Sequence, residues 1–182
     1  MRLVCPHMSD SASSEYSLWL TFDEGTDANA RYRDTIADLA AAHADAPNFN
    51  PHVTVLGGVV GTRETLVETT RSLASGTQPI DVEFGAIRCS TTTYQTVFRL
   101  VEPTADLFEL YKAARDAVGV DPGPYNPHVS LLYSGIALDK RLAVADAIDP
   151  AALPEAGRLT TLELVATAGP VAAWEPVYSV KL

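Results

Sequence analysis

Residues 50–56 read NPHVTVL and residues 126–132 read NPHVSLL, so the chain carries the same short pattern twice. In each copy a histidine is followed two positions later by a hydroxyl residue, inside an otherwise apolar run. Short runs rich in valine and leucine are typical of β-strands. The repeat therefore predicts two related strands.

Side chains of a strand alternate between its two faces, so residues two apart point the same way. His52 and Thr54 would therefore share one face of the first strand. His128 and Ser130 would do the same on the second strand, and the apolar residues between them would point into a core. Because histidine and hydroxyl side chains line one face of both strands, we predict that the two copies meet in space and form a site.

Two histidines suit general acid–base catalysis because the reference pKa of histidine lies near neutrality. One can act as a base and the other as an acid on opposite sides of a reacting centre. Thr54 and Ser130 could donate hydrogen bonds to phosphoryl oxygens and stabilise charge in the transition state. We predict His52 and His128 as the catalytic pair, and the residues alone leave open which is the base.

Other kinds of site fit the sequence less well. Zinc usually takes three or four protein ligands, but His7 and His43 lie outside the repeat, and the sequence contains no HExxH or paired-cysteine pattern. It also lacks the G-x-S-x-G turn of many serine hydrolases and the G-x-x-x-x-G-K-[ST] loop of nucleoside triphosphatases. We therefore predict a site that needs no metal and no other cofactor.

The balance of charge argues against long nucleic acids as partners. The chain has 23 acidic and 13 basic residues, which give a formal net charge of −10. Long RNA and DNA bind largely through neutralisation of their phosphates by lysine and arginine. A small ligand with one or two phosphates fits this chain better, and its 182 residues fit one domain or two small lobes.

The ends and the cysteines indicate the cellular setting. Cys5 and Cys89 cannot form a disulfide framework, which favours a reducing compartment. Residues 1–14 lack the apolar core of a signal peptide, and no run approaches the length of a membrane span. We predict a disordered leader over residues 1–14 and a soluble, cytoplasmic, monomeric protein without a membrane partner.

Hydrophobic periodicity and turn residues predict strands that alternate with helices. Thr26 or Asp27, Thr62 and Thr104 are the expected N-caps of the first three helices. The order of elements indicates a duplicated α+β fold of two related lobes, each an antiparallel sheet packed on helices. The two lobes are expected to form a single domain over residues 15–182, with a cleft between them. Strands are expected at 16–22, 51–57, 79–89, 94–101, 125–133, 158–168 and 174–182, and helices at 27–44, 62–73, 104–118 and 139–148.

Taken together, these patterns resemble the plant and fungal cyclic phosphodiesterases of the two-histidine phosphoesterase superfamily. The similarity covers most of the chain, from residue 16 to residue 182, and follows an ordered set of segments. These are YSLW at 16–19, F-x-PHVTV at 49–55, YQTVF at 94–98, PHVSLLY at 127–133 and W-E-x-V at 174–177.

The resemblance implies an enzyme that hydrolyses a cyclic phosphate on a ribose without a metal. Members of that family open nucleoside 2′,3′-cyclic phosphates to 2′-phosphates. They also open ADP-ribose 1″,2″-cyclic phosphate, which arises after tRNA splicing, to ADP-ribose 1″-phosphate. The resemblance further implies two lobes around a water-filled cleft and a small cyclic phosphate as the partner.

The resemblance also implies roles for single residues. His52 and His128 match the catalytic pair, and Thr54 and Ser130 match the phosphate donors. Tyr133 matches a position whose hydroxyl can reach the phosphate or ribose. It lies an odd number of residues from His128, so it needs a bulge or a strand end to turn inward.

Two further aromatic residues, Trp19 and Tyr94, match cleft positions at which a base or sugar could stack, although Trp19 could equally fill the core. Trp174 is expected to be structural.

The chain lacks the additional cysteines of the plant enzymes, so the resemblance implies no redox-dependent behaviour for this protein. Residues 57–63 and 119–124 differ from the family pattern, which leaves the choice of substrate open.

Two other functions remain to be distinguished from this one. An RNA end-processing enzyme of the 2′-5′ RNA ligase-like branch would act on oligonucleotide cyclic phosphate ends and would need a basic flank, for which Arg63, Arg88 and Arg99 are the candidates. A non-catalytic module that binds a nucleotide phosphate is disfavoured because both histidines are present.

Overall fold

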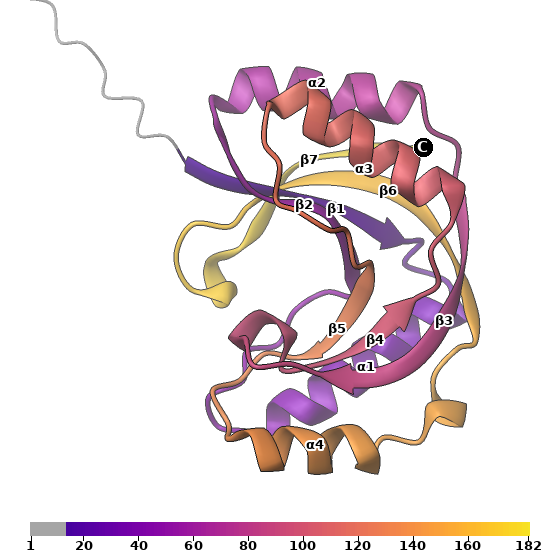
Figure 1. Ribbon diagram of the computed structural model, residues 1–182, viewed down its shortest axis with the longest axis vertical. Coiled ribbons are helices and arrows are strands. Elements are labelled where there is room, and N and C mark those ends of the chain that lie inside the picture. The colour runs from indigo at the N-terminus through magenta and orange to yellow at the C-terminus, as the bar shows by residue number, and fades with distance from the viewer. Residues whose placement is uncertain (1–13) are drawn as a thin grey trace, which may run out of the picture.

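The computed structural model describes residues 14–182 and has the predicted α+β architecture (Figure 1). The predicted leader lies outside the described residues, apart from Ser14, at which the first strand begins. The described part of the chain forms seven strands, four α-helices and three 3₁₀ turns. In chain order they are β1 Ser14–Phe22, α1 Asp27–Ala42, β2 His52–Gly61, α2 Arg63–Ser75, β3 Ile80–Cys89, η1 Thr93–Gln95, β4 Val97–Val101, α3 Ala105–Val118, β5 His128–Leu132, α4 Leu138–Ala147, η2 Pro150–Ala152, β6 Ala156–Ala166, η3 Val171–Ala173 and β7 Glu175–Lys181.

All strand pairings are antiparallel, and the seven strands form one sheet in the order β1-β2-β5-β4-β3-β6-β7, with a further pairing of β1 with β6. Residues 156–159 of β6 pair with β3, whereas residues 159–166 pair with β1 and, from Thr161, also with β7. One half of the sheet is therefore β2-β1-β6-β7, and the other half is β5-β4-β3 with the start of β6. The two halves meet again where β2 and β5 pair at Val53 and Val129.

Each half of the sheet has its own pair of helices, as expected for two lobes. α2 and α3 pack on the half that contains β2, β6 and β7, at the top of Figure 1, and we call this unit the first lobe. α1 and α4 pack on β3, β4 and β5, at the bottom, and form the second lobe. The lobes are interleaved in sequence, because α1 crosses to the second lobe and β6 and β7 return to the first.

The helix starts follow the predicted capping pattern. The hydroxyl oxygens of Thr26, Thr62 and Thr104 accept hydrogen bonds from backbone N–H groups three residues later, each at 3.3 Å. These bonds satisfy amide groups that otherwise lack a partner in the first helical turn. All three predicted N-caps are confirmed.

The two motif strands have the predicted alternation. Val53, Val55, Val129 and Leu131 are almost fully buried in the hydrophobic core. The histidines and hydroxyl residues of the motifs alternate with these apolar residues along each strand. Their side chains therefore point away from the helices and towards the space between the lobes.

Two predicted boundaries are wrong, for identifiable reasons. The pair Gly57-Gly58 was expected to end the first motif strand, but β2 continues to Gly61. A register shift places an additional residue on β2 between its pairings with Tyr16 and Leu18, and Gly58 has φ +67°. This is a β-bulge that only glycine adopts easily, so the strand bends rather than stops.

The second wrong boundary lies on the rim of the space between the lobes. The sequence predicts a strand from Tyr94, but Tyr94 belongs to the turn η1, and β4 begins at Val97.

No helix within the described residues has the length and apolar character that crossing a bilayer requires.

Candidate active site

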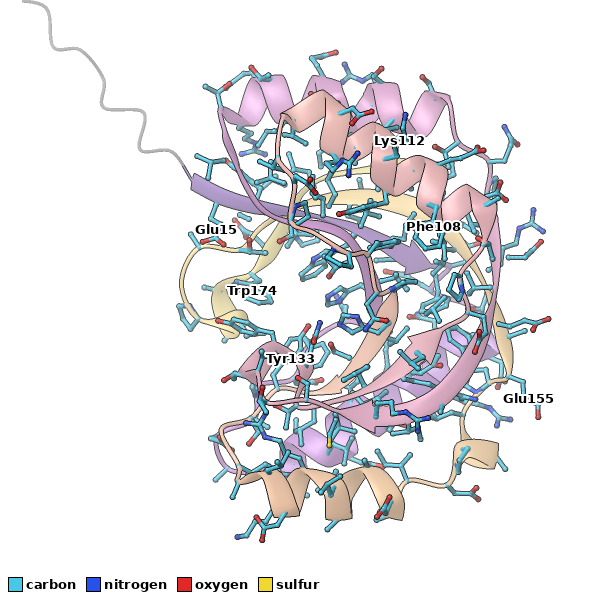
Figure 2. The ribbon with its side chains drawn as sticks, viewed as in Figure 1. Glu15, Phe108, Lys112, Tyr133, Glu155 and Trp174 are labelled. Carbon is cyan, nitrogen blue, oxygen red and sulfur yellow. The ribbon has the colours of Figure 1, made fainter. Side chains whose placement is uncertain are left out.

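A cavity of about 710 Å³ opens between the two lobes, and its size is ordinary for a small-molecule site. The first lobe contributes Trp19, His52 and Thr54, and the second lobe contributes Tyr94, His128 and Tyr133 to the lining. Six of the seven predicted site residues therefore surround one space, and three of its lining residues, Glu15, Tyr133 and Trp174, are labelled at the left of Figure 2. The remaining lining residues are Glu15, Ser17, Gly57, Gly58, Thr92, Gln95, Thr167, Gly169 and Trp174.

The pairing of β2 with β5 brings the two motifs together. Val53 pairs with Val129, and each of these residues directly follows the histidine of its motif. In an antiparallel register this sets each histidine opposite the hydroxyl residue of the other motif, on the same face. The structure thus places the two copies of the repeat side by side, related by an approximate two-fold arrangement.

Both imidazoles are held in the same orientation by backbone carbonyls. Nδ1 of His52 lies 2.7 Å from the carbonyl oxygen of Asn50, and Nδ1 of His128 lies 2.8 Å from that of Asn126. A carbonyl oxygen only accepts, so each Nδ1 carries the proton and donates it. The other ring nitrogen, Nε2, is left for proton transfer in both histidines. In both motifs the asparagine that supplies this carbonyl lies two residues before the histidine. This repeated Asn-Pro-His spacing could have indicated the bond, but the bond was not predicted from the sequence.

The ring of His52 is further fixed by Trp19. Their ring centroids are 3.6 Å apart with planes 10° from parallel, and Trp19 is only 7% exposed. One face of the indole is therefore already covered by the imidazole. Trp19 lines the cavity, as the resemblance implied, but the ring that stacks on it in the free protein is the imidazole of His52.

Burial makes the two histidines electrostatically different. Burial lowers the pKa of His52 to about 4. The hydrogen bond to Asn50 acts in the opposite direction, and the charge of His128 adds a smaller lowering. Burial also lowers the pKa of His128, against the hydrogen bond to Asn126. His52 is only 4% exposed whereas His128 is half-buried. Near neutral pH both rings are thus mainly uncharged in the free protein.

The two motif hydroxyls also differ. Thr54 lines the cavity, whereas Ser130 is buried and is not part of the lining. The Ser130 hydroxyl donates a hydrogen bond to the carbonyl oxygen of Tyr94 at 3.1 Å. This bond cannot be predicted from the sequence, because it depends on how η1 folds.

The aromatic residues gather at the mouth of the cavity. Tyr133 directly follows the last residue of β5, so the strand end turns it inward as its odd spacing required. It stacks on Phe49 at 4.0 Å, and burial raises the pKa of its hydroxyl to about 12. Tyr94 meets Tyr133 edge-on at 5.6 Å and is 53% exposed, so its ring is available to a ligand.

Trp174 is an addition to the site that sequence analysis had assigned to a structural role. It follows η3, on the loop between β6 and β7, and lies at the opening beside Tyr133 in Figure 2. Its ring is 5.4 Å from Tyr94 and 6.0 Å from Trp19, and its Nε1 donates to the carbonyl of Gly169. The loop brings the residue back to the cavity, a position that the expected structural role did not include.

The arginines proposed for a basic flank lie elsewhere. Arg63 donates to the carbonyl of Val177, and buried Arg99 donates to the carbonyls of Gly85 and Pro154. Arg88 bonds only to the carbonyl of its neighbour within the described chain. The cavity lining, as far as the structure describes it, contains no lysine or arginine.

A metal ion in the site would need a group of side chains that could hold it. Between residues 14 and 182, no three His, Cys, Asp or Glu side chains are grouped so that they could hold a metal ion. Independence from metals stays a prediction, which the chelator assay below tests.

The burial of His52 under Trp19 predicts a defined titration. Histidine resonances followed by NMR should show His52 titrating near pH 4 and His128 below the ordinary value of 6.5, both with the proton on Nδ1. Trp19→Leu should raise the pKa of His52 towards 6.5, because exposure to water favours the charged form. Trp174→Leu is the control, since the described ring contacts join Trp174 to Trp19 but not to His52, and it should leave that pKa in place. A His52 that titrates near 6.5 in the unaltered protein would contradict the geometry.

Comparison with known proteins identifies the family of this chain. Residues 15–182 match the family model described as cyclic phosphodiesterase-like protein. A cyclic phosphodiesterase of Arabidopsis thaliana is 24% identical over 135 residues, which are 74% of this chain and 73% of that protein.

Solved structures share the fold at low sequence identity. Escherichia coli LigT in its apo form gives a TM-score of 0.64 at 15% identity, covering 93% of this chain and 97% of that chain. LigT complexed with 3′-AMP gives 0.63 at 16% identity, covering 93% and 98%. TT0787 of Thermus thermophilus gives 0.60 at 13% identity, covering 92% and 97%. The match to the family model spans nearly the whole chain, so this protein belongs to the cyclic phosphodiesterase-like family of the two-histidine phosphoesterase superfamily and is an enzyme that acts on a cyclic phosphodiester.

Proposed function

We propose that this enzyme hydrolyses a cyclic phosphate on a ribose by metal-independent acid–base catalysis with His52 and His128. The substrate would be a nucleoside 2′,3′-cyclic phosphate, opened to the 2′-phosphate, or ADP-ribose 1″,2″-cyclic phosphate, opened to the 1″-phosphate. One observation carries this proposal: two imidazoles from different lobes line the same cavity, and both have Nδ1 bound to a carbonyl. Each therefore offers Nε2 to a single reacting group.

In the proposed reaction a water molecule attacks the phosphorus atom while one phosphorus–oxygen bond of the ring breaks. The base takes a proton from the water, and the acid gives a proton to the departing ribose oxygen. The product is a phosphate monoester with a free neighbouring hydroxyl, and the two histidines have exchanged protonation states. A proton transfer through solvent restores them for the next turnover.

The unequal burial of the histidines supports an assignment of roles. His52, whose pKa lies at about 4, is unprotonated over most of the pH range and suits the base. His128 is less buried and keeps a proton more readily, which suits the acid. Trp19 would serve by holding the ring of His52 in place rather than by stacking on a nucleobase.

The remaining site residues would bind the substrate. Thr54 would donate to a phosphoryl oxygen directly. Ser130 would do so after its hydroxyl turns from the carbonyl of Tyr94 towards the phosphate. Tyr133 would donate its firmly held phenolic proton, and Tyr94 together with Trp174 would stack on the base or sugar.

Two findings bear on the class of ligand. LigT, which shares the fold, has been crystallised with ATP, 3′-AMP and NADP+, so small nucleotides fit that fold. The absence of lysine and arginine from the described lining disfavours the alternative of a long RNA end as substrate. A monomeric state and a cytoplasmic location remain predictions from the sequence.

An activity assay tests this proposal directly. Adenosine 2′,3′-cyclic phosphate and ADP-ribose 1″,2″-cyclic phosphate should be offered in the presence of EDTA, and at least one should be hydrolysed. His52→Ala and His128→Ala should each lower kcat by about a hundredfold or more, the usual contribution of a general acid or base.

His43→Ala is the matched control for this assay. Its Nδ1 also bonds to a backbone carbonyl, that of Leu39, but it lies at the end of α1 outside the cavity lining. It should keep the normal rate. Loss of activity in EDTA would contradict the metal-free mechanism, and a near-normal rate for either cavity variant would show that histidine to be structural.

The two hydroxyl residues give a second test. Thr54→Val and Ser130→Ala should each lower kcat by about tenfold or more, because each would remove a donor to the charged transition state. Thr21→Val, on the neighbouring strand and outside the lining of this cavity, should leave kcat unchanged. A Ser130→Ala variant with raised KM and normal kcat would show instead that Ser130 only holds the Tyr94 backbone.

A further inference from the structure

We infer that Glu15 restricts this active site to substrates whose only negative charge is the cyclic phosphate itself. The inference rests on the proposed function, and it narrows the substrate class to cyclic phosphates of single nucleosides. ADP-ribose cyclic phosphate and oligonucleotide ends carry additional phosphates, and these would be disfavoured.

The first support is the charge of the cavity. Glu15 is the one carboxylate among the described lining residues, and the described lining includes no arginine or lysine to balance it. The two histidines are largely neutral in the free protein near neutral pH, since burial lowers the pKa of both. A cyclic phosphodiester has a single negative charge, which neutral hydroxyl donors and one protonated histidine can satisfy. Each additional phosphate would lack a counter-charge here.

The second support is the position of Glu15. Figure 2 shows it at the left of the opening, above Trp174 and across from Tyr133. Its backbone is fixed in β1, where it pairs with Val60, and its carbonyl accepts a hydrogen bond from the amide of Thr167 at 2.9 Å. Its side chain is exposed, and the described hydrogen bonds and ion pairs give its carboxylate no partner.

A second carboxylate occupies the neighbouring pocket. Trp19 and Trp174 line both the main cavity and an adjacent pocket of about 220 Å³. Glu163 is the one charged residue in the described lining of that adjacent pocket, where it accepts a hydrogen bond from Ser179. A long anionic ligand that reached both spaces would therefore meet a carboxylate in each.

The size of the effect follows from electrostatics. Two like charges about 4 Å apart in water weaken binding about fivefold, and the effect grows where water is partly excluded. Pyrophosphate adds two charges to ADP-ribose cyclic phosphate, and an oligonucleotide adds one per nucleotide. Because the repulsion acts through solvent at the rim, it should weaken as salt shortens the screening length.

A substrate comparison tests the inference. The kcat/KM values would be measured for adenosine 2′,3′-cyclic phosphate, ADP-ribose 1″,2″-cyclic phosphate and an oligoadenylate with a 2′,3′-cyclic phosphate end, at about 10 mM and about 150 mM salt. The unaltered enzyme should prefer the mononucleotide by at least about tenfold at low salt. Glu15→Gln should raise kcat/KM for the two multiply charged substrates about threefold to tenfold more than for the mononucleotide, and less at high salt.

Glu155→Gln is the matched control, because it removes the same charge on the opposite side of the molecule in Figure 2. It should leave the ratio of the three kcat/KM values as in the unaltered enzyme. Unchanged ratios in Glu15→Gln, with the mononucleotide still hydrolysed, would overturn the inference and leave the proposed function standing. Equal use of all three substrates by the unaltered enzyme would do the same. Failure to hydrolyse any of the three would overturn the proposed function and the inference together.

Discussion

The site depends on one constraint, the antiparallel contact between β2 and β5 at Val53 and Val129. Both residues are fully buried, so the alternation of each strand is fixed by packing against its own helices. A slip of one residue would turn every polar motif residue into the core. Because the register is held, His52 and His128 reach the same cavity from two separately packed lobes.

The duplicated motifs have become unequal within this common frame. Each histidine is oriented by the carbonyl two residues earlier, yet only His52 is covered by an indole ring. Likewise Thr54 faces the cavity, while the hydroxyl of Ser130 is bound to the carbonyl of Tyr94. An acid–base pair requires one protonated and one unprotonated group, and unequal burial of two identical side chains favours that arrangement.

Local signals were enough to predict the parts of the fold that local physics decides. The threonine caps and the alternation in the motif strands were predicted from nearby residues. The inward position of Tyr133 was implied by the family resemblance instead. The position of Trp174 could not be predicted, because it depends on β6 pairing with both halves of the sheet and on the loop that follows. The hydrogen bond of Ser130 depends on η1, which propensity had assigned to a strand.

The pH dependence of kcat/KM for adenosine 2′,3′-cyclic phosphate tests the central claim most directly. The rate should fall at low pH as His52 gains a proton near pH 4, because a base must be unprotonated. It should also fall as the pH rises through the pKa of His128, which lies below 6.5, because an acid must be protonated. The account predicts a bell-shaped profile with its maximum on the acidic side of neutrality. A profile without a basic limb, or with a maximum above pH 7, would contradict it.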